Sequence, residues 1–219
     1  MRAGIIVVFF LFRVSVSLVW AEPDEIDKKG CRDCHRFSSE GKQTKEGPDL
    51  FYAGDKFLKS WLKEFLQSPV VIRKVVYVSD SDYPTGQLEA NQPHLALTKE
   101  ESERISDFLM TLHLPSLEIN KMDEEPLSKG EREQAKILFE RKFGCISCHK
   151  ALNLVGKVRG GVSGPSLVNA GLRLKSDWIF HWLKTPKKFL SKGRMPVFDL
   201  DEETVAPLTK YILSIRTKP

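Results

Sequence analysis

The sequence predicts an all-α fold made of two similar helical domains in tandem. The first observation is a repeated landmark, GPDL from Gly47 and GPSL from Gly164. A tryptophan follows each glycine after fourteen residues, at Trp61 and Trp178. The second observation is that apolar residues recur at helical spacing after these landmarks, with no convincing pair of alternating strands. Self-similarity over a long period indicates a duplicated architecture.

The first element is a targeting segment over residues 1–21. Arg2 supplies a positive start, the apolar run AGIIVVFFLF follows, and LVWA ends in a small residue that suits cleavage after Ala21. This pattern predicts a signal peptide and export to the periplasm. Arg13 interrupts the apolar run. A retained segment would be an anchor near the minimum spanning length of about 17 residues, and we expect membrane contact only in that case.

The first domain is predicted over residues 22–117. A helix of at most two turns precedes Gly30, and the amphipathic segment DKFLKSWLKEFLQSP ends at Pro69. The stretch from Pro69 to Pro93 is fourteen residues longer than its counterpart in the second copy, so the first copy carries an insertion. A last helix is predicted after Thr98, whose side chain caps it and whose first turn is acidic.

The second domain is predicted over residues 118–219, after a polar boundary segment with two prolines at 114–130. Ser128 and Glu131 form a capping-box pattern, which predicts an amphipathic helix ending at Gly144. The helical segment SDWIFHWLKTP corresponds to the tryptophan-containing helix of the first copy. The final helix matches the last helix of the first copy, with Leu200 and Tyr211 spaced as Leu97 and Phe108 are.

The four cysteines all lie in two C-x-x-C-H motifs, CRDCH from Cys31 and CISCH from Cys145. Two cysteines at this spacing can add their S–H groups across the two vinyl groups of one haem. Each sulfur forms a bond to carbon, and the proton passes to the former double bond. The adjacent histidine then lies beneath the iron. C-x-x-C-H is the pattern of c-type haem attachment.

Two other kinds of site use similar cysteine pairs. A structural zinc site needs four ligands, typically two C-x-x-C knuckles together. A thioredoxin-like redox pair needs a parallel sheet, which the pattern lacks. Two copies behind an export signal favour haem. The cofactors predicted are therefore two covalently attached c-type haems, one bound by Cys31 and Cys34 and the other by Cys145 and Cys148.

The sequence resembles the dihaem cytochromes c, in which two class I cytochrome c domains are joined in tandem. The resemblance covers most of the chain after residue 21 and rests on GCRDCH, GPDL and QPHLALTKEE in the first copy and on GCISCH, GPSL and RMPVFDLDEE in the second. It implies two cytochrome c-like helical domains, each wrapped around one covalent haem. It also implies His35 and His149 as proximal iron ligands, with the carbonyls of Pro48 and Pro165 orienting them.

The sixth iron ligand differs between the copies. In the second copy GRMPVF matches the distal motif of the family, which implies Met195 as a thioether ligand that raises the reduction potential. In the first copy Gln92 stands at the equivalent position. His94 is two residues further on, and we predict it as the ligand. A weak Gln92 or water ligand and a vacant position remain alternatives.

The leading functional hypothesis is a periplasmic electron carrier that acts on redox protein partners and is not itself an enzyme. The net charge of +5 is mild and scattered, which argues against nucleic acid binding. Basic residues do surround the Met195 loop, where an acidic partner would dock at the edge of the second haem; they are Lys184, Lys187, Lys188, Lys192 and Arg194. The alternatives are a haem enzyme or small-ligand-binding protein with an open or weakly ligated first iron, and the cytochrome subunit of a larger oxidoreductase complex.

Overall fold

The chain is mostly helical, which confirms the predicted fold class at that level. The computed structural model describes residues 21–40, 47–73, 94–123, 125–153, 155–191 and 193–217. The predicted targeting segment up to residue 20, most of the predicted insertion including Gln92, and Lys192 lie outside these ranges. Within them, no helix has the length and apolar character that crossing a membrane requires.

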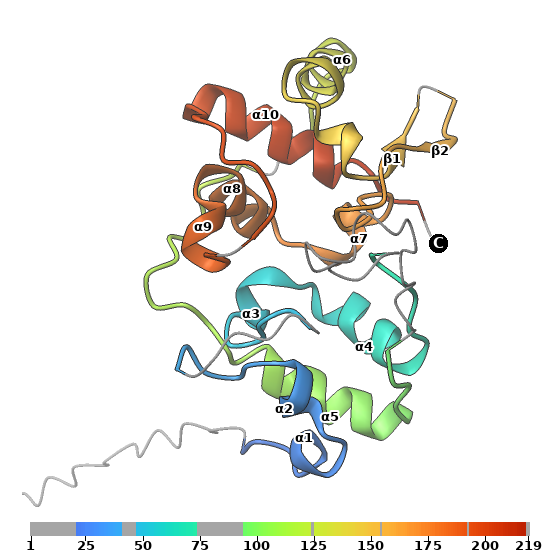
Figure 1. The fold of residues 1–219 in the computed structure, drawn as a ribbon, viewed down its shortest axis with the longest axis vertical. Coiled ribbons are helices and arrows are strands. Elements are labelled where there is room, and N and C mark those ends of the chain that lie inside the picture. The colour runs from blue at the N-terminus through green and yellow to red at the C-terminus, as the bar shows by residue number, and fades with distance from the viewer. Residues whose placement is uncertain are drawn as a thin grey trace, which may run out of the picture.

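The elements of the first half form the lower part of the molecule and those of the second half the upper part (Figure 1). The first half contains α1 (Glu25–Lys28), α2 (Cys31–Cys34), α3 (Ala53–Lys56), α4 (Lys59–Gln67) and α5 (Lys99–Leu109). The second half contains α6 (Lys129–Ile137), a π-helical turn (Leu138–Lys142), a 3-10 turn (Cys145–Ser147), α7 (Ala170–Arg173), α8 (Ser176–Lys184), α9 (Pro186–Phe189) and α10 (Glu202–Leu213). Two short strands, β1 (Ala151–Leu152) and β2 (Val158–Arg159), pair antiparallel.

Helix starts follow the capping chemistry that the sequence predicts. Thr98 and Glu101 form a reciprocal capping box at α5, and Ser128 and Glu131 form the same box at α6. In each box the hydroxyl accepts the N–H of the glutamate, and that carboxylate accepts the N–H of the capping residue, which satisfies two otherwise unpaired donors. Asp201 caps α10 by accepting the N–H of Thr204 at 2.8 Å. The last helix of each half therefore has a fixed start.

Each half packs its short middle helix against the end of its last helix. The N–H of Gly54 donates to the carbonyl of Leu112 at 2.9 Å, and the N–H of Gly171 donates to that of Ile215 at 3.1 Å. A Cβ on Gly54 would lie 2.6 Å from the Met110 carbonyl oxygen. Glycine is therefore required here because the two backbones approach too closely for a side chain. The same crossing in both halves agrees with the repeat in the sequence.

The two halves meet through corresponding residues. Phe57 and Leu174 form an isolated antiparallel bridge, and Leu174 stands 117 residues after Phe57, the offset that separates the two GPxL landmarks. Around this bridge α3 contacts α8 and α4 contacts α7, in the middle of the molecule in Figure 1. Pairing of each residue with its own counterpart is what a two-fold relation between the halves produces.

Two hydrogen bonds flank this bridge and obey the same relation. The N–H of Leu58 donates to the Arg173 carbonyl at 2.9 Å, and the N–H of Lys175 donates to the Lys56 carbonyl at 3.0 Å. Lys175 corresponds to Leu58 and Arg173 to Lys56, each at the 117-residue offset. The two bonds are therefore equivalent, and the contact between the halves is pseudo-symmetric at the level of backbone atoms.

An aromatic cluster beside this contact is not symmetric. Tyr52 of the first half stacks on Trp178 of α8 with ring centroids 4.6 Å apart, and Phe189 of α9 packs against both rings. All three side chains are buried. Burial of large aromatic rings contributes strongly to the stability of such a contact. The cluster thus fixes α8 against the first half of the chain.

Candidate functional site

A left-handed glycine opens each C-x-x-C-H turn. Gly30 has a φ of 65° and Gly144 a φ of 62°, a region that glycine adopts without strain. Gly30 leads directly into α2, which contains the first cysteine pair, and Gly144 leads into the 3-10 turn with the second. A π-helical turn, Leu138–Lys142, precedes the second motif, and such turns occur often at functional sites. The two motifs therefore have closely similar entries.

All four motif cysteines are thiols. Burial raises the pKa of Cys31 and raises the pKa of Cys145 to about 11. These two groups therefore keep their protons at neutral pH. A protonated, half-buried thiol is the reactant that adds as S–H across a double bond.

Each predicted proximal histidine makes the same kind of hydrogen bond. His35 Nδ1 lies 2.7 Å from the Pro48 carbonyl oxygen, and His149 Nδ1 lies 2.7 Å from that of Pro165. These are the contacts that the resemblance implied. A carbonyl oxygen can only accept, so Nδ1 carries the proton, and in the neutral ring Nε2 keeps its lone pair. That tautomer is the one in which Nε2 can bind a metal.

Both rings favour the neutral state. Burial lowers the pKa of His35, and the nearby His94 and Lys56 lower it further. Burial also lowers the pKa of His149, with a smaller contribution from Arg173. A histidine with a lowered pKa stays neutral at pH values somewhat below its usual 6.5. Both Nε2 lone pairs are therefore available at neutral pH.

A glycine next to each histidine leaves room for the ring. A Cβ on Gly47 would lie 2.4 Å from His35 Cε1, and a Cβ on Gly164 would lie 2.6 Å from His149 Cε1. Real Cβ atoms do not approach ring atoms so closely, so any side chain would push the imidazole away. The glycine of each GPxL landmark is thus needed for the position of the histidine, and its proline provides the hydrogen-bond acceptor.

A buried cation lies near each histidine. Lys56 and Arg173 end the corresponding helices α3 and α7, and Arg173 is only 5% exposed. Burial lowers the pKa of Lys56 to about 8, with repulsion from Arg173 adding to the effect, and burial lowers the pKa of Arg173 to about 10. Arg173 donates from Nε to Asn169 Oδ1 at 3.1 Å and from Nη2 to the Ser166 carbonyl at 2.6 Å. Lys56 Nζ lies over the Phe57 ring, 4.9 Å from its centroid. These neutral partners do not cancel the two charges, so each site still offers a charge that suits a cofactor with carboxylate groups.

An ion pair joins the two motifs of the first site. Arg36, the residue after His35, donates from Nε and Nη2 to the two carboxylate oxygens of Asp49 at 2.8 and 2.7 Å. Asp49 is 3% exposed and directly follows Pro48. A bidentate pair of this kind fixes orientation as well as supplying attraction. It holds the GPDL loop, and therefore the Pro48 carbonyl, against the C-x-x-C-H turn.

His94 lies next to His35. The two ring centroids are 6.0 Å apart with an angle of 43° between the planes. His94 Nδ1 donates to the Leu95 carbonyl at 2.8 Å, so its Nε2 also keeps a lone pair. A metal between two Nε2 atoms, with bonds of about 2 Å each, separates the centroids by roughly 6 Å. The observed spacing therefore fits one metal between the two rings. The alternative ligand, Gln92, lies outside the described residues.

Met195 is half-buried, and its sulfur accepts a hydrogen bond from Trp182. Trp182 Nε1 lies 3.1 Å from Met195 Sδ. Trp182 is four residues after Trp178 on α8, as Phe65 is four residues after Trp61 on α4. The Phe65 ring is 5.6 Å from that of His94. His94 and Met195 thus each contact the corresponding residue of their half, Phe65 or Trp182, although the sequence aligns Gln92 with Met195.

Two of the basic residues around Met195 have partners, and one of these partners is an acid. Lys184 Nζ lies 3.1 Å from a carboxylate oxygen of Glu202, and Lys187 donates to the Gly193 carbonyl. Lys187 and Lys188 are exposed. Exposed ion pairs such as Lys184 with Glu202 contribute little to stability, so these cations act mainly through the surface field.

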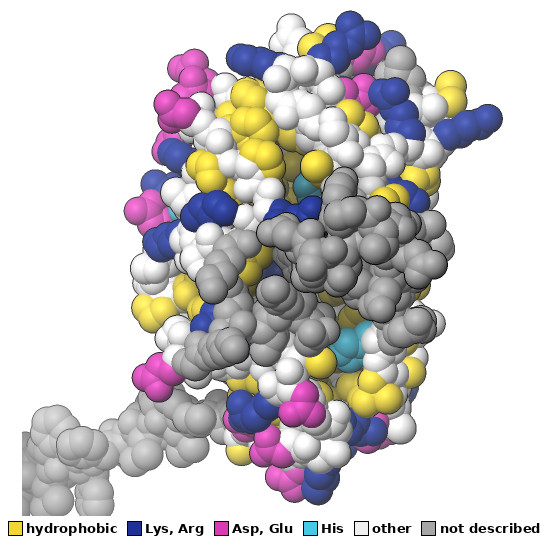
Figure 2. Space-filling view, in the orientation of Figure 1, with side chains coloured by type: hydrophobic (Ala, Val, Ile, Leu, Met, Phe, Trp, Pro, Cys, Tyr) yellow, Lys and Arg dark blue, Asp and Glu magenta, His cyan; other side chains and the backbone are white. Residues whose placement is uncertain are grey.

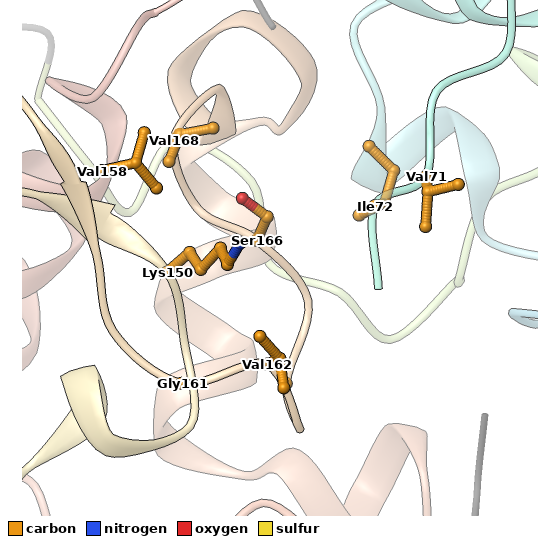
Figure 3. A pocket seen from close by; sticks show the side chains of 9 residues that line it. Val71, Ile72, Lys150, Val158, Gly161, Val162, Ser166 and Val168 are labelled. Carbon is orange, nitrogen blue, oxygen red and sulfur yellow. The ribbon is translucent and has the colours of Figure 1, made fainter. Parts of the chain in front are cut away.

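A cavity of about 160 Å³ lies between the segment after α4 and the loop that carries Pro165. Val71 and Ile72 lie across it from Ser166 and Val162 (Figure 3). The N–H of Ser166 donates to the Ile72 carbonyl at 2.7 Å. The segment after α4 therefore contacts the loop whose carbonyl orients His149, and the two halves are linked at the second site.

Histidine is visible among hydrophobic side chains over both the lower and the upper half of one face (Figure 2). Across the described ranges, no three His, Cys, Asp or Glu side chains are grouped so that they could hold a metal ion. Haem iron has a different requirement, because the porphyrin supplies four ligands and the protein supplies the axial ones. Neutral imidazoles, thiols at the C-x-x-C spacing and a buried cation at each site fit that group.

Four of these residues are not indicated by the C-x-x-C-H motifs. Lys56 and Arg173 hold corresponding places in AGDKF and AGLRL. The sequence signal for these two residues was a cation repeated at the same position beside apolar residues. Trp182 and Phe65 are also corresponding residues. The repeat shows that the positions of Trp182 and Phe65 are equivalent. Their contacts with Met195 and His94 arise only in the folded chain.

The chain was compared with known proteins at three levels. No family model matches it, and no curated protein or solved structure matches it either. The inference about these two centres therefore rests on the residues and their geometry.

Proposed function

We propose that this chain is an exported dihaem cytochrome c that carries single electrons between redox proteins in the periplasm. In this proposal residues 22–117 and 118–219 form two cytochrome c-like domains, each around one covalent haem. The observation that carries the proposal is the geometry repeated at both motifs. In each C-x-x-C-H motif the histidine donates from Nδ1 to a proline carbonyl at 2.7 Å, and a glycine leaves room for the ring.

The proposed attachment uses one cysteine pair for each haem. Cys31 and Cys34 would hold the first haem and Cys145 and Cys148 the second, with His35 and His149 as proximal ligands. Lys56 and Arg173 would neutralise haem carboxylates, which would relieve the unfavourable burial of their charges. When bound, the haem iron supplies a reversible one-electron change between its ferrous and ferric states. Each site would accept one electron from a donor and pass it on, with no net chemistry on the protein.

The two sites would differ in reduction potential. His94 would be the sixth ligand of the first iron and Met195 that of the second. A thioether favours the reduced iron more than an imidazole does, so the second site would have the higher potential. Electrons would then move favourably from the first site to the second. The partners are proposed to be redox proteins, with an acidic one at the surface near Lys187 and Lys188.

Two other functions are compatible with a pair of haem sites. A haem enzyme or a small-ligand-binding protein needs an open or weakly held first iron. The 6.0 Å spacing of His35 and His94 favours a filled position instead. A cytochrome subunit of a larger oxidoreductase complex would use the same two sites in the same way, and would differ only in staying bound to its partner.

The test is to count covalent haems by mass. Wild-type protein expressed with periplasmic haem attachment is expected to carry two haems. Replacing Cys31 and Cys34 by alanine is expected to remove the first haem, and replacing Cys145 and Cys148 the second. Each double variant is the control for the other. A wild-type mass without haem would overturn the proposal.

Spectroscopy of the same sample separates the carrier from the alternatives. Electron paramagnetic resonance is expected to show two low-spin ferric irons. Carbon monoxide is expected to leave the first haem of the reduced protein unchanged. A high-spin iron that binds carbon monoxide would instead support the enzyme or ligand-binding function. Stable co-purification with a partner oxidoreductase would identify a complex subunit.

A further inference from the structure

Trp182 of α8 contacts the sulfur of Met195, the proposed sixth ligand of the second iron. The indole Nε1–H donates to the thioether sulfur at 3.1 Å. Sulfur is a weak acceptor, and indole nitrogen can only donate. The bond therefore has a defined direction, and it places a partial positive charge against one side of the sulfur.

The indole ring is held in place by its neighbours. Its centroid is 5.9 Å from that of Trp178 and 5.9 Å from that of Phe189, on which it stacks with an angle of 22°. Trp178 in turn stacks on Tyr52 of the first half. Aromatic rings at these distances attract one another beyond the area that they bury. The donor is therefore fixed by the aromatic cluster between the halves.

We propose that Trp182 is a positioning residue that selects which sulfur lone pair of Met195 faces the second iron. A thioether sulfur has two lone pairs, and binding through one or the other gives opposite configurations at sulfur. The indole N–H engages one of them and leaves the other for the iron. The proposal rests on the proposed function, because it assumes that Met195 is a ligand of the second haem.

The corresponding position in the first half has no hydrogen-bond donor, and this difference supports the proposed role of Trp182. Phe65 corresponds to Trp182 and lies 5.6 Å from His94, ring to ring. A neutral imidazole has a single lone pair, on Nε2 in this tautomer. An N–H donor at position 65 would compete with the iron for that lone pair. The N–H donor of Trp182 thus lies beside Met195, whose sulfur has two lone pairs. Phe65, which has no donor, lies beside His94, whose ring has a single lone pair.

The hydrogen bond has a second consequence. It draws electron density away from the sulfur, so Met195 becomes a weaker donor to ferric iron. Ferric iron needs ligand donation more than ferrous iron does, and hydrogen bonds to ligands are among the factors that tune haem potentials. Loss of the N–H is therefore expected to shift the reduction potential of the second haem to a lower value.

The experiment compares Trp182→Phe with Trp61→Phe in the full chain carrying both haems. Each change keeps an aromatic ring on its helix, and only the first removes the donor to Met195, because Trp61 stacks on Phe57 and Phe65 of the first half. Nuclear magnetic resonance of the oxidised protein follows the shifted Met195 methyl signal, which reports the configuration at sulfur. Redox titration follows the second haem, and Met195→Ala identifies its methyl signal and its sulfur-to-iron absorption band.

We expect wild type and Trp61→Phe to show one Met195 configuration and the same potential of the second haem. Trp182→Phe is expected to show the opposite configuration or an average of the two, together with a lower potential. Unchanged configuration and potential in Trp182→Phe would overturn this inference alone. A missing second haem, or an absorption band that survives in Met195→Ala, would overturn it together with the assignment of the ligand.

Discussion

The imidazole rings of His35 and His94 lie 6.0 Å apart, centroid to centroid, although 59 positions separate them in the chain. Each ring donates from Nδ1 to a backbone carbonyl, at 2.7 Å for His35 and 2.8 Å for His94. Both rings therefore keep the same nitrogen, Nε2, for a ligand. In the proposed function these two nitrogens would be the axial ligands of the first iron.

The first prediction concerns His94→Ala. Loss of the imidazole is expected to leave the first iron with one axial protein ligand, and so to make it high-spin and able to bind carbon monoxide. Absorption and electron paramagnetic resonance spectra measure both changes. His113→Ala is the matched control, because His113 Nδ1 is 2.6 Å from Asp55 and not near His35. Identical spectra for wild type and His94→Ala would show that another group binds the iron.

The second prediction concerns the glycine beside the second histidine. Gly164→Ala adds a Cβ that would lie 2.6 Å from His149 Cε1, so the ring or the loop must move. Overpacking of this kind costs about 1–3 kcal/mol. Urea unfolding followed at the second haem band measures the loss. Gly130→Ala in α6 meets no atom within 4 Å and is expected to stabilise by up to about 1 kcal/mol. Equal effects of both changes would contradict this account.

The third prediction concerns the ion pair behind the first motif. Arg36→Met leaves the Asp49 carboxylate buried without its bidentate partner, which is expected to cost about 3 kcal/mol of unfolding free energy. Arg32→Met breaks an exposed pair with Asp27 and is expected to cost less than about 1 kcal/mol. Chemical denaturation compares the two variants. Asp49→Leu combined with Arg36→Met should recover much of the loss, and failure to recover it would assign the effect to packing.

The fourth prediction concerns the contact between the halves. Leu58→Pro removes the N–H that donates to the Arg173 carbonyl, and the φ of −78° at this position suits proline. The expected loss is about 1 kcal/mol relative to Leu58→Ala, which keeps the N–H. Denaturant midpoints of the two variants provide the comparison. A proline variant as stable as the alanine variant would mean that this bond contributes nothing.

Local features of the structure follow directly from the sequence. The capping boxes at Thr98 and Ser128 depend on residues three positions apart, so their pattern is visible in the letters. The glycines before each cysteine pair and the proline carbonyls near His35 and His149 recur at fixed offsets, and the repeat reveals them. These are short-range relations, which pattern reasoning can predict.

Long-range relations were not predictable in the same way. Alignment of the two copies puts Gln92 opposite Met195, whereas in the fold His94 and Met195 share equivalent neighbours. An insertion changes which residue of the first half reaches the position equivalent to Met195, and sequence alignment alone does not predict which residue that is. The buried charges of Lys56 and Arg173 depend on how the halves pack. Such placement is decided by tertiary packing and not by local propensity.

The bridge between Phe57 and Leu174 matches a residue with its own counterpart, as in a homodimer with two-fold symmetry. In a homodimer every substitution appears twice, so both protomers must carry the same ligand. A fused chain keeps the partner at an effective concentration that is millimolar or so for a short tether. It also allows one copy to change alone. Covalent duplication therefore permits the two proposed sixth ligands, His94 in one half and Met195 in the other, to differ within a frame that remains nearly symmetric.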